Sequence, residues 1–433
     1  MGTEITLDIG GMTITWSKND RGHDHGFLFQ SADRKRFHCD VADYEEGGSD
    51  AAKVAEMEIG FTRPLRTVVP RLELLGYTIA AAKVDYDEMA EACREQDSEE
   101  TPPDLMTFEE FVALLKTVAV GDLDNTFVSN LDDSAVQGRF NDERQKARIP
   151  YYSSYDTDAY SERSYFGSLV RFLHPYALLR LLAENPANLD LNLDWQYGPL
   201  VSAGWAQADQ FEPNARRTQT YLIATEGSSD IHILDRAFQL LRPEIADFFR
   251  FIDVKEGHPF SGTGSLVKFA EGLAKIDVHN RTVFLLDNDA EGVSGFRKIS
   301  KMVLPMNMRT ITLPPLDAFS KFPSCGPDGE LLADINGKAA SIECYLDLSA
   351  NGLPRPLVRW TNFKEDMGVY QGSLVEKERY YKAFFDRTGR KEPYDTSNLN
   401  AALAAIVDTC TTMATEMFRH DAESVTSRAN ALI

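Results

Sequence analysis

Two groups of acidic residues, each directly after a short apolar run, are the side chains most suited to chemistry in this chain. They are Glu226 and Asp230 after residues 221–225, and Asp287 and Asp289 after residues 282–286. Carboxylates that lie close together repel one another unless a cation lies between them. Carboxylate oxygens are hard ligands, which suit Mg²⁺ or Mn²⁺ better than zinc. The pattern therefore predicts a magnesium or manganese site.

The two apolar runs are the elements that must position these carboxylates. Runs of this length and apolarity are typical of strands buried on both faces of a parallel sheet. After the first run, Gly227 allows a tight turn, and Ser228 or Ser229 can cap a helix. In open α/β sheets, ligands bind outside the carboxyl ends of the strands. We therefore expect the four carboxylates to converge at one edge of a sheet.

The order of these motifs resembles the TOPRIM domain, which topoisomerases, primases and a group of nucleases share. Glu226-Gly and Asp287-x-Asp289 both follow hydrophobic runs, as in that domain. Asp230, four residues after the glutamate, and a later Ser341-x-Glu343 are similar to the nuclease branch typified by the OLD (overcoming lysogenisation defect) family. The resemblance covers roughly residues 218 to 390. It implies an α/β fold with a Rossmann-like parallel sheet flanked by helices.

The resemblance also implies roles for individual residues. Five carboxylates would hold one or two Mg²⁺ or Mn²⁺ ions: Glu226, Asp230, Asp287, Asp289 and Glu343. Glu226 would double as a general acid or base, and Ser341 would support the site. OLD-type nucleases place a lysine from a later region near the scissile phosphate, for which Lys377 is the first candidate and Lys382 the second. The function implied is a divalent-metal-dependent endonuclease that hydrolyses phosphodiester bonds of nucleic acid.

The first half of the chain points to a biological setting. A hairpin followed by helices resembles the amino-terminal regions beside TOPRIM or HEPN modules in bacterial conflict systems, which implies an effector of anti-phage defence. The HEPN ribonuclease signature needs four to six residues between its Arg and His. Arg171 and His174 do not fit it, and Pro175 makes a helix boundary the better interpretation.

The net charge of −22 limits how the protein can hold a polyanion. Proteins that grip nucleic acid by bulk electrostatics are usually basic, so any grip must be local. Bound metal ions, the cluster of Arg297, Lys298 and Lys301, or a basic partner subunit could supply it. The chain has no Walker A motif, so ATPase or sensor control would come from a separate protein. Substrate DNA and substrate RNA remain open, and the last predicted helix, residues 399–418, could form a homodimer.

Other cysteine, histidine and hydropathy patterns argue against further sites. The five cysteines show no C-x-x-C spacing, so we expect reduced thiols without a zinc site. His23, His25, His38 and Cys39 fit no metal-binding spacing and are interpreted as a solvated loop. No apolar run reaches membrane-spanning length, and no secretory signal is evident. A cytoplasmic protein without membrane contact is the expectation.

The expected organisation has three parts. Residues 1–215 form a mixed, mostly helical α+β domain that opens with a β-hairpin; residues 216–350 form the TOPRIM domain; residues 351–433 form a C-terminal helical extension. Within them, residues 164–183 are predicted as one helical stretch, and residues 188–213 as a connection. Residues 314–337 are predicted as a surface loop, and residues 370–382 as the start of a helix.

Alternative functions use the same acidic positions. A topoisomerase needs a tyrosine nucleophile on another domain, and no motif singles out one of the 16 tyrosines. A primase is usually accompanied by a zinc module, which is not evident. A non-enzymatic TOPRIM scaffold, or a metal-binding interaction or switch subunit, stays open. The motif Ser341-x-Glu343 argues against a receiver-like switch, which has no need for it.

Overall fold

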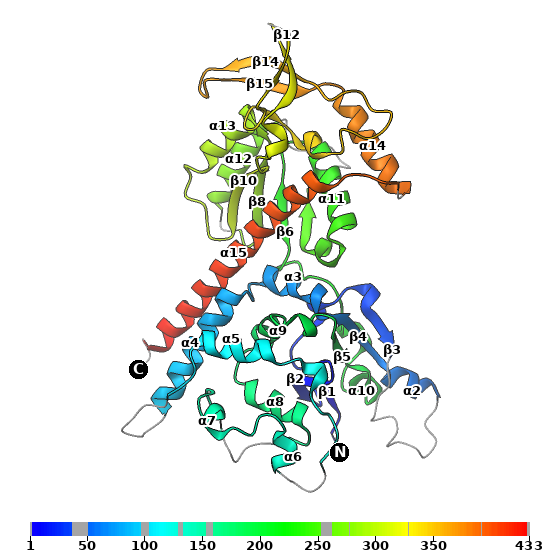
Figure 1. Ribbon diagram of the computed structural model, residues 1–433, viewed down its shortest axis with the longest axis vertical. Helices are drawn as coiled ribbons and strands as arrows, with labels where there is room; N and C mark the ends of the chain where they lie inside the picture. Colours follow the sequence, from blue (N-terminus) through cyan, green and yellow to red (C-terminus); the bar gives the residue numbers. More distant parts are fainter. Residues whose placement is uncertain are drawn as a thin grey trace. The chain divides into compact units, whose positions relative to one another are not determined.

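A computed structural model describes most of the chain as two compact units. The described residues are 2–36, 51–96, 104–128, 133–152, 159–252, 262–276, 278–327, 329–390 and 392–430. His38 and Cys39 of the predicted loop lie outside them. One unit consists of Met1–Ala215 with Phe418–Ile433, and the other of Arg216–Met417. Figure 1 shows the helices and strands of each unit.

The first unit contains a five-stranded antiparallel sheet with the strand order β2-β1-β5-β4-β3. Its strands are β1 Glu4–Ile9, β2 Met12–Lys18, β3 Arg34–Arg36, β4 Ile59–Pro64 and β5 Asn192–Gln196. The predicted hairpin of β1 and β2 is confirmed. The predicted connection was wrong at β5, which occupies the centre of the sheet. Only its alternate residues Leu193 and Trp195 are buried, so the segment is too short and too polar for an apolar run to reveal it.

Helices surround this sheet. They are α2 Ala51–Met57, α3 Leu65–Leu75, α4 Ile79–Gln96, α5 Phe108–Thr117, α6 Asp133–Gln137, α7 Glu143–Lys146, α8 Glu162–Val170, α9 Pro175–Leu182 and α10 Gly198–Ser202. The predicted stretch 164–183 is two helices, because the Pro175 ring lacks an N–H and fits the first helical turn. The side chain of His174 caps α9 by accepting from the Tyr176 N–H. The His174 side chain therefore serves as a helix cap.

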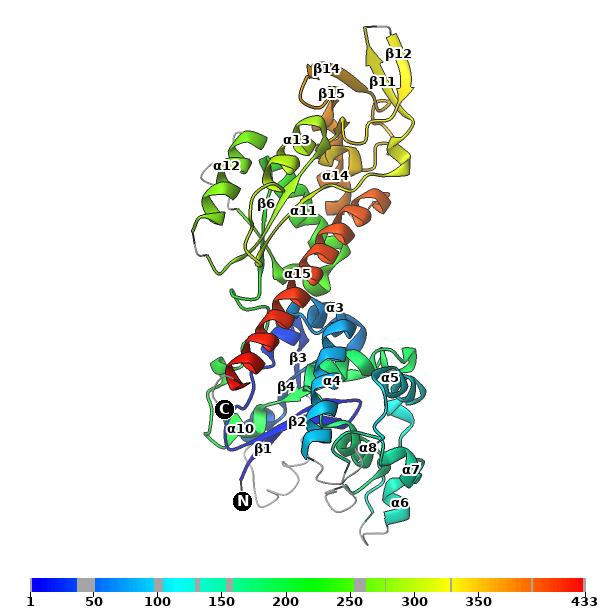
Figure 2. The same cartoon turned by 90° about the vertical axis from the view of Figure 1, so that its left-hand side faces the viewer.

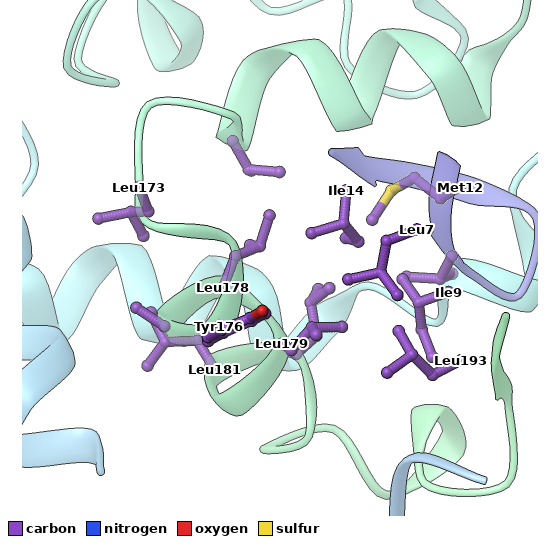
Figure 3. Close-up of a cluster of buried hydrophobic side chains, with 14 of the residues drawn as sticks. Leu7, Ile9, Met12, Ile14, Leu173, Tyr176, Leu178, Leu179, Leu181 and Leu193 are labelled. Carbon is purple, nitrogen blue, oxygen red and sulfur yellow. The ribbon is translucent and has the colours of Figure 1, made fainter. Parts of the chain in front are cut away.

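The core of the first unit joins the hairpin to α9. Leu7, Ile9, Met12 and Ile14 point from the hairpin toward Leu179 and its neighbours on α9 (Figure 3). All of these side chains are buried. Alternation along the two strands and the helical period of α9 place apolar residues on facing surfaces, which explains why this part of the fold follows from the sequence pattern.

The second unit is built on a four-stranded parallel sheet with the order β10-β8-β6-β7. Its strands are β6 Tyr221–Ala224, β7 Phe249–Phe251, β8 Arg281–Leu286 and β10 Met308–Thr312. Helix α11, Ser228–Leu241, covers one face, and α12, Thr263–Ala274, with α13, Ala290–Ile299, covers the other (Figures 1 and 2). The chain moves outward in opposite directions from β6 and from β8, so their carboxyl ends form the topological switch point.

Smaller elements extend this unit. Strand β9, Asn288–Asp289, pairs with β13, Ala339–Ala340. A further sheet has the order β12-β11-β14-β15. Its strands are β11 Phe322–Gly326, β12 Gly329–Ala333, β14 Val358–Lys364 and β15 Val369–Leu374. The helix α14 Lys377–Arg390 follows, and then α15 Ser397–Asn430, whose residues from Phe418 on belong to the first unit. Within the part of the chain that the structure describes, no helix has the length and apolarity needed to cross a membrane.

Three predictions for this unit were wrong. The insert 314–337 contains the hairpin of β11 and β12, and the supposed helical extension opens with β14 and β15. Residues 370–374 lie in strand β15, because they pair with β14, and the helix begins only at Lys377. In each case antiparallel pairing with the adjacent strand overrides the local preference.

Candidate metal centre

Glu226 connects three elements at the switch point. Its Oε1 atom accepts a hydrogen bond from the backbone N–H of Asp287 at 3.1 Å, and its Oε2 atom accepts one from the hydroxyl of Thr263. The end of β6, the end of β8 and the start of α12 therefore meet at one carboxylate. Thr263 was missed as a site residue, although the sequence places it in a Gly-Thr-Gly turn before a helix.

Asp230 lies in the first turn of α11 and is only 9% exposed. Its Oδ2 atom accepts from the Gly227 N–H at 3.0 Å, and its Oδ1 atom accepts from the Ser229 hydroxyl at 3.3 Å. The N-cap is therefore Gly227, where we expected Ser228 or Ser229. Glycine has no side chain to cap with, so the aspartate makes the capping hydrogen bond instead.

Asp287 and Asp289 follow β8 in an extended segment. The Asp287 Oδ1 atom accepts from the Ile342 N–H at 3.1 Å. Asp289 is the N-cap of α13, where its Oδ1 atom accepts from the Gly292 N–H at 2.7 Å. Its Oδ2 atom accepts from Gln371 Nε2 at 2.6 Å. A Cβ atom at position 292 would lie 2.2 Å from the Asp287 carbonyl oxygen, so only glycine fits there.

Glu343 and Lys377 complete the cluster. Glu343 is 3% exposed, and its Oε2 atom accepts from the Ser341 hydroxyl at 2.7 Å. The Lys377 Nζ atom lies 3.3 Å from Glu343 Oε1, and the lysine side chain is 50% exposed. The Ser-x-Glu motif lies on a short 3₁₀ turn, Ile342–Tyr345. Lys382, the alternative lysine, is exposed further along α14.

The electrostatics show that these carboxyl groups share one cluster. Burial raises the pKa of Asp287 well above its usual value, and the charges of the other four carboxylates raise it further. Burial, followed by the charge of Glu343, raises the pKa of Asp230 to about 7. Burial also raises the pKa values of Glu226 and Asp289.

Lys377 responds to the same negative field. Burial alone would lower its pKa, but the charges of Glu343, Asp287 and Asp230 outweigh that effect and raise it. The structure thus brings together Glu226, Asp230, Asp287, Asp289, Glu343, Ser341 and Lys377.

The donor set fits a hard cation, although the side chains do not form a closed ligand cage. The donors are oxygens, and their mutual repulsion is the condition that a bound cation relieves. Among the described residues, however, no three His, Cys, Asp or Glu side chains are grouped closely enough to hold an ion. Several carboxylate oxygens point instead at Thr263, Gln371 and Ser341. Side-chain rotations must therefore accompany metal binding.

The fold places the second unit in a class: α/β proteins built on a parallel sheet flanked by helices, which here has the carboxylate cluster at its switch point. The amino-terminal half identifies the family. Residues 1–219 match the family model HEPN/Toprim N-terminal domain 1, which covers half of the chain, and the protein belongs to this family.

The match agrees with the expected HEPN- and TOPRIM-associated first half, and it hints at a nuclease-like role. It ends before Glu226, so the carboxylate cluster must be interpreted from its own geometry. No curated protein and no solved structure matches the chain.

Proposed function

We propose that this protein is a divalent-metal-dependent endonuclease that hydrolyses phosphodiester bonds of nucleic acid. In this proposal the second unit contains a TOPRIM domain of the OLD type. The observation that carries it is the convergence of five carboxylates and one lysine at the switch point of a parallel sheet. Uncompensated like charges are unfavourable to folding, and such strained electrostatics are concentrated at functional sites.

The proposed division of labour follows from the contacts. When bound, Mg²⁺ or Mn²⁺ supplies Lewis acidity to water and to the phosphate. Glu226, Asp230, Asp287, Asp289 and Glu343 hold it, and Ser341 orients Glu343 through its hydroxyl.

Glu226 and Lys377 have further roles in this proposal. The Oε2 atom of Glu226 lies against the Thr263 hydroxyl, and burial raises the pKa of this carboxyl, which favours a role in proton exchange. Lys377 is half exposed beside Glu343, where it can contact a substrate phosphate.

The biological setting is part of the same proposal. The family match, together with the resemblance of the second half to OLD-type nucleases, supports an effector of anti-phage defence in the cytoplasm. The substrate is DNA or RNA. A separate ATPase or sensor subunit would control the enzyme, and a homodimer would be a suitable assembly.

A cleavage assay tests this function. Full-length protein is incubated with plasmid DNA, single-stranded DNA and total RNA in Mg²⁺, Mn²⁺ or EDTA, and is compared with Asp287→Asn. We expect metal-dependent cleavage that falls at least about 100-fold in the variant, because loss of an outer-shell partner alone costs up to that much. Asp386→Asn, an exposed acid on α14, is the matched control and should cleave normally. Equal cleavage by wild type and Asp287→Asn would refute the site.

A non-enzymatic metal-binding switch is the second candidate. It is favoured by the finding that, in the described part of the chain, no three candidate ligands form a ready cage. Such a switch would bind Mg²⁺ and change shape without cleaving any polymer. Calorimetric titration of wild type and Asp287→Asn with Mg²⁺ separates the two candidates: binding that needs Asp287, without cleavage of any of the three substrates, favours the switch.

A further inference from the structure

Trp360 lies across the β12-β11-β14-β15 sheet between two glycines on neighbouring strands. It faces Gly372 of β15 in the strand register. A Cβ atom built on Gly372 would lie 2.9 Å from Cε3 of the indole, and one built on Gly326 of β11 would lie 3.3 Å from Cδ1. Cδ1 belongs to the five-membered ring and Cε3 to the six-membered ring, on either side of Cγ, so the indole lies between the two glycines. Because the two glycines have no side chains, they leave room for the indole, and a larger residue at either position would crowd it.

This indole forms part of the wall of a cavity of about 380 Å³. The cavity is lined by two aromatic side chains, one lysine and mostly small or apolar residues, of which Trp360, Tyr370, Lys338, Leu331, Ala333 and Asp334 matter here. Tyr370 is 53% exposed and packs edge-on against Phe363. Its exposed ring and the indole are the two flat surfaces available to a ligand.

The charged groups of the cavity favour an anionic ligand carrying a flat ring. The Lys338 ammonium donates to the Asp334 carbonyl oxygen at 3.2 Å, which holds the cation at the cavity. The Asp334 carboxylate is the opposing charge, and its Oδ1 atom accepts from the backbone and side-chain nitrogens of Asn336. Those two hydrogen bonds hold the Oδ1 atom of the carboxylate within its own turn, and the Lys338 ammonium bonds to the backbone carbonyl of the same residue, where its charge can reach a phosphate.

The same backbone segments carry residues of the cavity and residues of the candidate metal centre. The backbone of Lys338 forms an isolated parallel β-bridge with that of Asp289, and the Gly372 N–H donates to the Lys338 carbonyl oxygen. Gln371, which donates to Asp289, directly follows Tyr370 in β15. Successive residues of a strand point to opposite faces, so one strand presents Tyr370 to the cavity and Gln371 to the metal centre.

We propose that this cavity is a nucleobase subsite, in which an unpaired base next to the cleaved phosphodiester stacks on Trp360. The proposal rests on the proposed nuclease function and names its substrate class: single-stranded or locally unpaired nucleic acid. Base stacking on aromatic side chains is a common sequence-tolerant way to hold single strands. A base in a continuous duplex is paired and stacked, and is not free to enter.

Intrinsic fluorescence tests the subsite directly. Trp360 is the only tryptophan of residues 216–433; the others are Trp16, Trp195 and Trp205. Full-length protein is titrated with oligo(dT) and oligo(U) ten-mers and with a blunt ten-base-pair duplex, in EDTA and in Mg²⁺. The difference between wild type and Trp360→Phe isolates the signal of this indole. We expect the single strands, and not the duplex, to quench it.

Affinity measurements provide the second readout. Fluorescein-labelled single strands should bind Trp360→Ala about tenfold more weakly by anisotropy, which is the lower range for loss of one stacking partner. Trp360→Phe should retain most of the affinity, because it keeps an aromatic face. Retained binding in this variant would also show that the sheet tolerates substitution at this position. Trp205→Ala is the matched control: this tryptophan is 57% exposed in the other unit, and its loss should leave binding unchanged.

The outcomes separate this subsite from the nuclease function. Quenching by single strands, together with weaker binding by Trp360→Ala, supports the subsite. This holds even if no polymer is cleaved, because the absence of cleavage would refute only the nuclease function. Equal binding of duplex and single strand, or unchanged affinity in Trp360→Ala, overturns the subsite. If cleavage still depends on Asp287, the nuclease function remains supported.

Discussion

Both units bury titratable side chains, but they handle the resulting cost in different ways. In the first unit His25 is buried beside Tyr176, to whose hydroxyl its Nδ1 atom lies at 2.6 Å, and beside the ring of Trp195. Burial lowers its pKa to about 3, so the imidazole remains neutral. In the second unit burial and neighbouring negative charges raise the pKa values of Glu226, Asp230, Asp287 and Asp289. Burial with a neutral hydrogen-bonding partner supports the fold, whereas burial among like charges is typical of functional sites.

His25 and the carboxylate cluster should therefore respond to pH in opposite directions. His25 has a folded pKa below its usual 6.5, so the stability that it contributes is present above 6.5 and is lost as the pH falls toward about 3. The loss should reach about 5 kcal/mol at the acid end. Following acid unfolding by circular dichroism, we expect His25→Gln to flatten this loss; an unchanged acid limb would contradict the comparison.

For the carboxylate cluster the sign is reversed. The folded pKa of Asp230 is about 7, above its usual value of 3.8, and that of Asp287 is raised as well. Their stabilising contribution is therefore full below 3.8 and is lost as the pH rises through about 7. In EDTA, Trp360 fluorescence should report a lower unfolding midpoint at pH 8 than at pH 6. Addition of Mg²⁺ should restore the midpoint at pH 8.

Asp287→Asn should stabilise the metal-free protein while it abolishes cleavage. The amide is isosteric, its oxygen can still accept from the Ile342 N–H, and it removes the most strongly coupled charge. We expect the free energy of unfolding in EDTA to rise by about 1–2 kcal/mol. Chemical denaturation at pH 7.5 measures it. If this variant were less stable than wild type, the cluster would be a structural network and not a strained site.

Lys377 gives the smallest effect and separates catalysis from support. Lys377→Gln should slow cleavage about tenfold, since one positive charge next to the phosphate is lost. Lys382→Gln, on the same helix and exposed, is the control and should cleave normally. Single-turnover rates at saturating substrate distinguish a slower chemical step from weaker binding. Equal rates for both variants would remove Lys377 from the site.

The sequence was most informative where chemistry and fold coincide. Glu226 and Asp287 directly follow apolar runs, and the parallel sheet requires such strand ends to meet. Thr263 and Gln371 could not be assigned in this way, because they lie 37 and 82 residues from the carboxylates that they contact. Their side chains are ordinary on any surface, and only the packing of α12 and β15 against the site gives them a role.

The missed strands have a related cause. In β5 and β15 only alternate residues are buried, and polar residues separate them. A helix was predicted across residues 370–382 because Glu, Lys and Arg are abundant in its second part. Pairing with β14 decided the first part instead. Short sheets held together by distant partners leave little periodic signal in the sequence.

Strand β15 makes register a functional property of this protein. Tyr370 belongs to one face of the strand, and the next residue, Gln371, holds Asp289 from the other. Because side chains alternate with a period of two, a slip of one residue would exchange these faces. A single-residue insertion in β15 would thus turn Gln371 toward the Trp360 cavity and Tyr370 toward the carboxylates. The proposed base recognition and the proposed metal binding would then be lost together, so the register of this strand could not change for one without changing the other.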